Sequence, residues 1–295
     1  MIDKESIALV VVLFNPSEDD IEFVHCIASE YGGVVADNSA CESFAGTEIG
    51  KMTYVPLMEN TGIAHAQNVS IQHILLNSHF KYILFLDQDS RFSNNFPLRM
   101  AEEHEKMKTV VPNLAMLGPI VVNKDTGDSY KSCFHDDKQS ENGFIVRREI
   151  ISSGSIVDRE CLEHVGGMLD SLFIDFVDFE WCWRAKKKEY VCGITANISL
   201  NHKVGVNMKK IGNYSLMIWK PFRYFYQYRN YLWLSRTDYT PWQWRIATGV
   251  KFMLRLFYFP LLVSDGWQCW KKMLRGIACS FKGYSEFRKE IEEYG

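Results

Sequence analysis

The sequence predicts an α/β fold with a mainly parallel sheet, followed by a helical C-terminal part. Residues 82–86 are an unbroken apolar run, which is typical of a strand covered on both faces. Strand-like and helix-like segments alternate along the first half of the chain, as they do in parallel sheets. Beyond residue 213 the pattern is long, basic and helical, with expected breaks at Pro221, Pro241 and Pro260.

The first half of the chain predicts the element order β-α-β-β-α-β. Its Val-rich first strand ends at Asn15-Pro16-Ser17, and the next helix has an acidic first turn, which the helix dipole favours. A second helix begins where Gly62 turns the chain and runs to about residue 77. The predicted strands span residues 7–14, 34–39, 53–57 and 82–86.

The middle of the chain contains two irregular segments. Polar residues 123–142 have no clear period and predict a surface loop. Small residues around Gly154 would let the chain pass close beside a ligand. The regular elements expected here are a helix over residues 97–108, a strand over 115–122 and a helix within 173–189.

Two carboxylates, Asp87 and Asp89, follow the central apolar strand. They lie at its carboxyl end, where open α/β sheets bind their ligands. Because residues two apart on an extended chain point the same way, both side chains can reach one cation or one diphosphate. The alternative is an ordinary Asp/Ser turn after a strand.

Asp37 and His202 are two further single candidates. Asp37 ends an early strand and could accept a hydrogen bond from a pyrimidine N–H, although a turn aspartate would look the same. His202 could complete a metal site with Asp89, although a lone histidine is more often structural.

Three acids, Asp175, Asp178 and Glu180, lie among aromatic residues. Apolar surroundings raise carboxylate pKa values, which suits a general acid or base. In a purely structural interpretation Asp178 caps the following helix and Glu180 is a first-turn charge. The two interpretations are compatible, because an N-cap carboxylate can also face a cleft.

Charge is distributed unevenly along the 295 residues. Residues 1–202 hold 17 Lys and Arg against 30 Asp and Glu, whereas residues 203–295 hold 16 against 6, a surplus of +10. This tail also holds 22 of the 41 aromatic residues. Basic and aromatic side chains together favour an anionic membrane surface, and a nucleic-acid surface can look similar. The apolar runs are too short to span a bilayer, so we expect membrane association without passage.

The eight cysteines form no Cys-x-x-Cys pair and no zinc spacing, so reduced cytosolic thiols are expected. The acidic start of the chain leads into a strand-like run and predicts no secretory signal. Together these features predict a cytoplasmic protein.

Taken in order, the motifs resemble the GT-A fold of inverting family 2 glycosyltransferases, and above all their bacterial rhamnosyltransferase branch. The resemblance covers residues 7–205. Each motif alone is weak, but the ordered set is specific. The motifs are Phe14-Asn15-Pro16, Asp37-Asn38-Ser39, Asn60-Thr61-Gly62-Ile63-Ala64 with Gln67-Asn68, Leu86-Asp87-Gln88-Asp89-Ser90, Ser153-Gly154, Gly166-Gly167-Met168-Leu169-Asp170, residues 173–184, and His202 with Gly205.

The resemblance implies a divalent cation, Mg²⁺ or Mn²⁺, held beside the donor diphosphate. Asp89 is similar to the direct metal ligand, Asp87 to the acid on the ribose or metal side, and His202 to the late histidine of that site. Many relatives begin the first motif with Thr-Tyr, where this chain has Leu13-Phe14. The residues implied to bind the nucleotide sugar are Phe14, Asn15, Asp37, Asn60, Gly62, Asn68, Asp87, Gln88 and Gly154.

Asp178 resembles the catalytic base of the family. Many relatives have an acid directly before it, where this chain has Val177, so Asp175 remains a rival for the role. The composition of the segment suggests that its aromatic residues shield the base and stack on the acceptor sugar. These aromatic residues are Phe176, Phe179 and Trp181.

The activity implied by the resemblance is inverting transfer of L-rhamnose from dTDP-L-rhamnose to a lipid-linked oligosaccharide, in O-antigen or capsule assembly. The alternatives are another nucleotide-diphospho sugar such as a UDP-hexose, a metal-dependent nucleotidyltransferase, or a non-catalytic sugar- or nucleotide-binding scaffold. A nucleotidyltransferase predicts a Gly-rich phosphate loop after the first strand, which this chain lacks. A scaffold predicts missing ligands, yet Asp89, Asp178 and His202 are present.

We expect residues 1–210 to form the GT-A domain and residues 211–295 a basic, aromatic-rich helical region. Residues 221–226 and Arg229-Asn230 resemble C-terminal segments of the same branch. The tail is expected to lie peripherally on the inner face of the cell membrane, beside a polyprenyl-diphosphate-linked glycan and without a nucleic-acid partner. The alternative is a helical bundle that forms a homodimer or packs on the catalytic domain.

Overall fold

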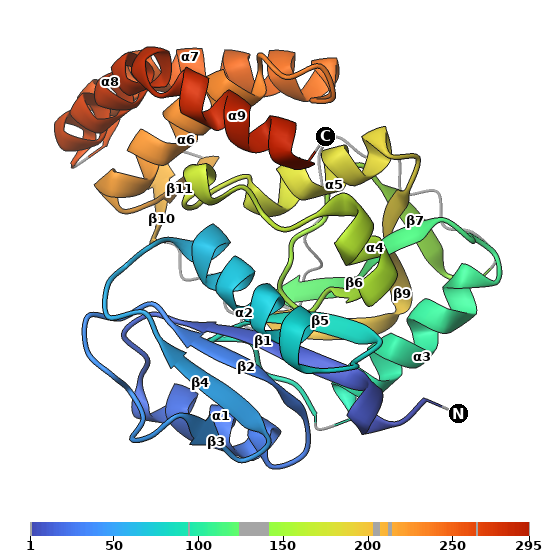
Figure 1. Ribbon diagram of the computed structural model, residues 1–295. Coiled ribbons are helices and arrows are strands. Elements are labelled where there is room, and N and C mark those ends of the chain that lie inside the picture. The colour runs from blue at the N-terminus through green and yellow to red at the C-terminus, as the bar shows by residue number, and fades with distance from the viewer. Residues whose placement is uncertain are drawn as a thin grey trace.

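The computed structural model describes residues 2–93, 95–123, 142–202, 207–211, 214–263 and 265–294, with side chains outside residues 122–123 and 201–217. A nine-stranded mixed sheet forms its centre, in the order β3-β4-β2-β1-β5-β8-β6-β9-β7 (Figure 1). The strands are β1 (Ile7–Leu13), β2 (Gly32–Asp37), β3 (Glu48–Ile49), β4 (Met52–Pro56), β5 (Tyr82–Asp87), β6 (Leu114–Asn123), β7 (Phe144–Arg147), β8 (Ile156–Asp158) and β9 (Val191–His202).

Strand β1 is buried along its whole length between β2 and β5, with which it pairs in parallel. The register sets Leu13 beside Asp37 and Val12 beside Asp87. Because parallel strands end at the same edge, the polar tips of the three strands meet there. The predicted α/β fold is confirmed, and the short β8 adds antiparallel pairing to β5 and β6.

Alternate residues of β1 point into two apolar cores on opposite faces of the sheet. Helices α2, α4 and α5 cover one face, and α1 and α3 cover the other. Ser17 caps α1 in a reciprocal capping box with Asp20, as the sequence leads one to expect. The helices of this part are α1 (Glu18–Ala28), α2 (Ile63–Asn77), α3 (Phe96–Lys108), α4 (Arg159–Val165) and α5 (Val177–Lys187), with 3₁₀ turns η1 (Lys4–Ser6) and η2 (Asp170–Leu172).

A layer of C-terminal helices lies over α5 in Figure 1. Trp233, Trp244 and Phe287 of this layer belong to the same apolar core as Trp181 of α5, so the two parts of the chain share a core. The division at residue 210 stays a prediction. The C-terminal elements are the hairpin β10 (Asn207–Ile211) and β11 (Tyr214–Ile218), then α6 (Pro221–Leu234), α7 (Trp242–Leu262), α8 (Gly266–Lys282) and α9 (Tyr284–Tyr294).

Two details of the expected C-terminal part are wrong. Residues 214–218 are a strand and not a helix, because they pair with β10. Pro260 lies inside α7, where a break was expected. Its missing N–H removes one hydrogen bond from the last turn of the helix, which ends two residues later. Most of the polar loop expected at 123–142 lies outside the described residues.

Candidate active site

The loops after β1, β2 and β5 are tied together by hydrogen bonds. The N–H of Phe14 donates to Oε1 of Gln88 at 2.7 Å, and the N–H of Asn15 donates to Oγ of Ser39 at 2.7 Å. Phe14 is 45% exposed and Asn15 is exposed as well. The three strand ends therefore present one polar surface, with an aromatic ring at its rim.

Asp37 is buried at the end of β2, where its carboxylate accepts from three donors. The N–H groups of Ser39 and Ser43 donate at 3.1 Å, and the hydroxyl of Tyr54 donates at 2.7 Å. Burial acts to raise the pKa of Asp37, but these hydrogen bonds outweigh it and lower the pKa below its ordinary value. Asp37 is thus held ionised as an acceptor.

The loop between β4 and α2 is hydrogen-bonded to Asn38, the residue after Asp37. Asn38 accepts from the N–H of Thr61 at 2.8 Å and donates to Oδ1 of Asn60 at 3.2 Å. Gly62 has a φ of +91°, and a Cβ there would lie 2.6 Å from the ring of Phe173. Only glycine fits between these two segments without displacing one of them.

Asp178 lies in the first turn of α5, next to the loop that contains Gly154. Its carboxylate accepts from the N–H of Ser152 at 3.2 Å and from the N–H of Phe179 at 3.0 Å. Burial, aided by the negative charge of Asp87, raises the pKa of Asp178 to about 7 against the effect of these bonds. The N-cap of α5 is Phe176, so the structural alternative in which Asp178 caps this helix is wrong.

The loop at 152–154 joins Asp178 to the end of β5. Oγ of Ser153 lies 2.9 Å from Oγ of Ser90, and the N–H of Gly154 donates to the carbonyl of Phe85 at 2.8 Å. Gly154 has a φ of +76°, which favours glycine. The loop therefore fixes the candidate base relative to the Asp87-Gln88-Asp89 tip.

Asp87 ends β5 and is half-buried, and Asp89 is exposed two residues later, so a role of the two carboxylates as ligands of Mg²⁺ or Mn²⁺ stays a prediction. Such ions are commonly held by one or two carboxylates plus phosphate oxygens. Among the residues that the structure describes, no three His, Cys, Asp or Glu side chains form a complete metal cluster. His202 ends β9 opposite Asn123, but its side chain lies outside the described part, so its role stays a prediction.

Asp175 is occupied by an ion pair with Arg223 of α6. Two guanidinium nitrogens donate to its two carboxylate oxygens at 2.5 and 3.2 Å. Asp175 and Phe176 both have left-handed backbones, with φ of 67° and 69°. The two candidate bases are therefore in different environments, because Asp175 pairs with a cation and Asp178 accepts from two backbone N–H groups.

Asn68 ties α2 to the segment before α5. Its side-chain amide donates to the carbonyl of Met168 at 2.7 Å and to Asp170 at 2.6 Å, and its Oδ1 accepts from the N–H of Met168 at 2.7 Å. Asp170 also lies 2.6 Å from Nδ1 of His65. Asn68 is buried in these contacts, so they explain it as a positioning residue, and a direct contact with nucleotide stays a prediction.

The expected stacking of Trp181 on an acceptor sugar is wrong. Trp181 is 0% exposed and donates from its ring N–H to the carbonyl of Gly166 at 2.8 Å. Phe176 and Phe179 are packed against the same core. Glu180 is also buried, in an ion pair with Arg184 at 2.9 Å. The aromatic segment packs the helix that carries Asp178 onto the sheet.

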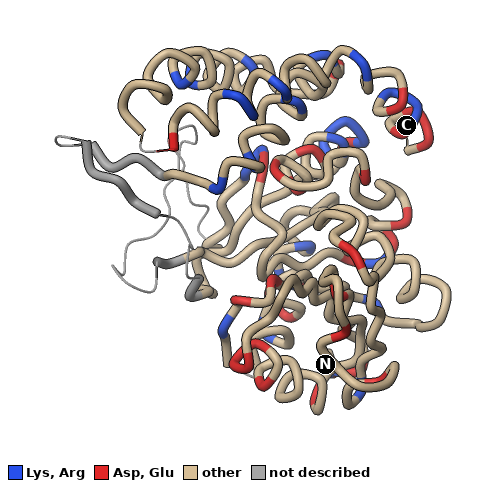
Figure 2. The backbone as a smooth tube through the Cα atoms, turned by 90° about the vertical axis from the view of Figure 1, so that its left-hand side faces the viewer, with Lys and Arg blue, Asp and Glu red and all other residues tan. Residues whose placement is uncertain are grey.

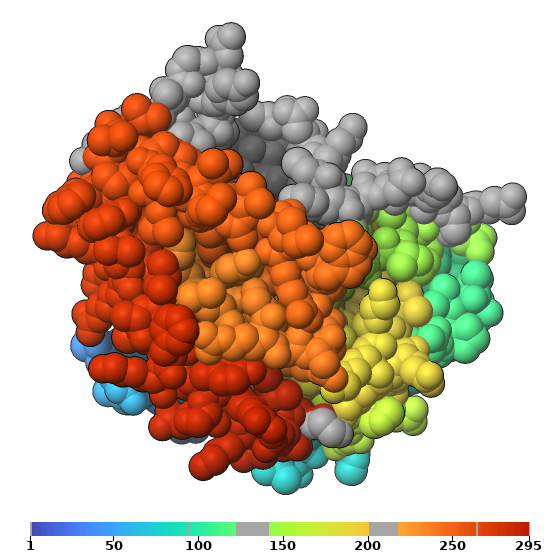
Figure 3. All heavy atoms as spheres, turned by 90° about the horizontal axis from the view of Figure 1, so that it is seen from above, coloured from blue at the N-terminus to red at the C-terminus, as the bar shows by residue number. Residues whose placement is uncertain are grey.

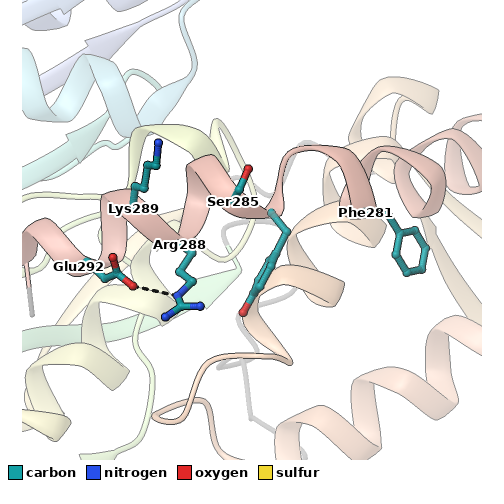
Figure 4. Close-up of a pocket in the computed structure, with 6 residues that line it drawn as sticks. Phe281, Ser285, Arg288, Lys289 and Glu292 are labelled. Atoms are coloured by element: carbon teal, nitrogen blue, oxygen red, sulfur yellow. Dashed lines mark hydrogen bonds and ion pairs between the residues drawn. The ribbon is translucent and has the colours of Figure 1, made fainter.

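A surface recess on the C-terminal helices contains none of the predicted site residues. Arg288 and Glu292, one helical turn apart on its wall, pair with each other at 2.8 Å (Figure 4). The recess is lined by Phe281, Tyr284, Ser285, Arg288, Lys289 and Glu292.

Comparison with known proteins shows the family of the chain. No protein-family model matches the sequence. The chain is similar to the dTDP-rhamnosyl transferase RfbF of Shigella flexneri, with 30% identity over 254 residues, 81% of this chain and 82% of that protein. The chain belongs to the same glycosyltransferase family as this relative. The resemblance expected from the sequence is confirmed.

Solved structures show the fold of the glycosyltransferase to be GT-A. The structure of S. aureus TarS residues 1–349 matches with a TM-score of 0.53 and 11% identity, over 95% of this chain and 91% of that one. GalNAc-T7 with UDP, GalNAc and Mn²⁺ matches with a TM-score of 0.56 and 12% identity, over 98% of this chain and 58% of that one. At 11% and 12% identity, these matches are evidence for the fold and not for the activity.

Several residues that hold the acids of the candidate site were not predicted from the sequence. Tyr54, Ser152 and Arg223 act through hydrogen bonds to acids far away in the chain. Tyr54 carries one usable signal, since a polar aromatic residue in a predicted buried strand needs a partner for its hydroxyl.

Proposed function

We propose that the glycosyltransferase transfers L-rhamnose from dTDP-L-rhamnose to a lipid-linked oligosaccharide, with inversion at the anomeric carbon. The donor is inferred from the named activity of the Shigella flexneri relative. The acceptor and its place in O-antigen or capsule assembly are inferred from the resemblance to the same branch. On this proposal the enzyme works in the cytoplasm, at the inner face of the membrane.

The observation that supports the proposal is the loop at 152–154, which bonds to Asp178 through Ser152 and to the end of β5 through Ser153 and Gly154. The candidate base therefore lies near the carboxyl end of β5, and the charge of Asp87 adds to the rise in its pKa. An inverting displacement needs a base on the acceptor side and charge neutralisation on the leaving-group side. On this proposal Asp178 supplies the base, and Asp87 acts on the leaving-group side.

Asp178 is the better of the two candidate bases. A pKa of about 7 lets it accept a proton from a sugar hydroxyl near neutral pH. Asp175 is held by two bonds from Arg223, so it would have to break an ion pair before accepting a proton. We assign Asp178 the base and Asp175 the positioning of the segment before it.

The nucleotide would lie across the ends of β1 and β2. Asp37, kept ionised by Tyr54 and two backbone N–H groups, would accept from the ring N–H of thymine. The exposed ring of Phe14 would cover the base. A divalent ion held by Asp87 and Asp89 would neutralise the diphosphate as it leaves.

Donor binding tests the proposal most directly. Purified protein is offered dTDP-rhamnose, UDP-glucose, UDP-GlcNAc and GDP-mannose, each with Mg²⁺ or Mn²⁺, and thermal stabilisation and donor hydrolysis are recorded. We expect dTDP-rhamnose to give the largest effect. If a UDP-sugar stabilises or turns over and dTDP-rhamnose does neither, the donor assignment is wrong.

Asp178→Asn and Asp175→Asn separate the two candidate bases. We expect Asp178→Asn to bind dTDP-rhamnose like the wild type and to lose transfer by at least about a hundredfold, as for removal of a general base. Asp175→Asn should keep measurable transfer and lose stability. Full transfer by the Asp178 variant would move the base to another residue.

A further inference from the structure

The outer side of helix α7 is a continuous exposed apolar surface. Seven large apolar side chains there are each 48% exposed or more. At about 100° per residue they fall within roughly 120° of the helix circumference. We call these residues the α7 outer face: Trp242, Ile246, Val250, Met253, Leu254, Phe257 and Leu261.

The opposite side of α7 is already buried in the protein. Trp244, Phe252 and Phe259 point there and are at most 9% exposed. They pack against the core and against α6. The helix therefore has two apolar sides, of which one is buried in the protein and the other is exposed.

Helix α8 continues the surface with an apolar edge and a basic edge. Trp267 is 55% exposed and Phe281 is 67% exposed, and they lie along one side of the helix. Lys271, Arg275 and Lys282 flank that side and are exposed. Figure 3 shows α7 and α8 together on one face of the molecule. A helix with this division is typical of those that lie in a membrane interface.

The charge of this part of the chain is mainly positive. Residues 239–285 contain seven Lys and Arg, of which Arg255 is buried, and one acid, Asp265. Lys and Arg gather along the upper helices in Figure 2. A two-fold homodimer through this face would bring like charges of two copies together, because such interfaces are self-complementary. An anionic lipid surface satisfies both the apolar stripe and the basic edge.

We infer that the α7 outer face and the basic edge of α8 bind the surface of an anionic lipid bilayer. The helices would lie parallel to the membrane, with α7 side chains among the lipid chains and Lys271 and Arg275 at the headgroups. None of the described helices is long and apolar enough to cross a bilayer. The inference deepens the proposed function. Only the role of membrane binding in reaching a lipid-linked acceptor rests on that function.

Helix α6 links this surface to the candidate base. The side-chain amide of Asn230 donates to the carbonyls of Leu172, Ile174 and Asp175 at 2.8 to 3.1 Å. The segment thus held leads directly into α5 and Asp178. A protein resting on α7 and α8 would have its base-bearing segment fixed relative to the membrane that presents a lipid-linked acceptor.

Vesicle co-sedimentation of the full chain tests the inference without donor or acceptor. The vesicles are phosphatidylcholine alone, or phosphatidylcholine with about a third phosphatidylglycerol. We expect binding to the anionic vesicles that salt weakens. The double variant Phe257→Ser/Leu261→Ser should lower the partition coefficient at least about tenfold, because two anchors are lost. Lys271→Glu/Arg275→Glu should abolish the preference for phosphatidylglycerol.

Two control variants test whether vesicle binding depends on the α7 outer face and the basic edge of α8 in particular. Leu76→Ser in α2 removes another leucine that is 82% exposed and should leave binding unchanged. Lys51→Glu/Lys106→Glu makes the same charge change on the catalytic part and should also leave it unchanged. Light scattering reports the oligomeric state of each variant.

Two results would overturn the inference. One is equal binding of wild type and the Phe257/Leu261 variant to anionic vesicles. The other is a wild-type dimer that the same variant converts to monomer, which would assign the face to a second copy. Vesicle binding can succeed while dTDP-rhamnose fails to bind, so failure of the donor assignment is seen separately.

Discussion

Replacing Asp178 with Asn is expected to stabilise the protein at alkaline pH while it removes the base. Burial and Asp87 raise the pKa of Asp178 from an ordinary 3.8 to about 7, so the folded state prefers the neutral carboxyl. Between these two values the folded protein holds a proton that the unfolded chain has released. The free energy of unfolding therefore falls as pH rises through this window, and it levels off above pH 7.

The size of the effect follows from the two pKa values of Asp178. At ~1.4 kcal/mol per pH unit, ionising the carboxyl in place costs about 4 kcal/mol above pH 7. At pH 5 less than half of this cost applies. Asn stays neutral at every pH and resembles the protonated acid. The variant should thus gain about 3 kcal/mol on the wild type between pH 5 and pH 8.

Urea denaturation of both proteins at pH 5, 6, 7 and 8 measures this difference. EDTA is included so that no divalent ion offsets the repulsion from Asp87. Asp19→Asn, a change of an exposed first-turn acid in α1, serves as the matched control and should show no such pH-dependent gain. Parallel stability curves for wild type and Asp178→Asn would refute the raised pKa of the Asp178 carboxyl on which the proposed mechanism depends.

Three further substitutions test the parts around the base. Tyr54→Phe removes a donor to the Asp37 carboxylate, so the pKa of Asp37 should rise and the dissociation constant for dTDP, measured by calorimetry, should increase by about tenfold or more. Arg223→Ala leaves Asp175 without its cation and should cost about 1–3 kcal/mol in urea denaturation, with faster hydrogen exchange in the segment before α5; Arg223→Lys should restore part of the loss. Asp89→Asn should remove the extra thermal stabilisation that Mn²⁺ gives to bound dTDP and leave the metal-free dTDP affinity unchanged. An unaltered Mn²⁺ effect in that variant would exclude Asp89 as a ligand.

The sheet was predictable because each of its central strands is a continuous apolar run that can be recognised from neighbouring residues alone. Residues 7–13 and 82–87 are continuous apolar runs, and both are buried strands. The strands that sequence reasoning missed are short or are held by distant partners. Strand β8 has three residues, too few to show a period, and exists because β5 and β6 lie on either side of it.

The places of the candidate acids in the fold were predictable from the sequence, but the partners that surround each acid were not. Asp37, Asp87 and Asp178 were recognised by their place after strands or at a helix start. The choice between Asp175 and Asp178 depended on Arg223, which is 48 residues farther along and becomes a partner only after α6 docks. A sequence pattern contains no information on which acid an incoming cation will neutralise.

The same docking explains why an unfavourable backbone persists just before α5. Phe173, Asp175 and Phe176 have φ values of 64° to 69°, a region that costs about 1–2 kcal/mol per residue without special support. The support comes from α6, whose Asn230 amide binds three carbonyls of the segment and whose Arg223 holds Asp175. The turn they enforce starts α5 where Asp178 meets the N–H of the 152–154 loop. The C-terminal helices therefore shape the geometry of the candidate site, and a membrane bound at the α7 outer face would act through α6 on the same segment.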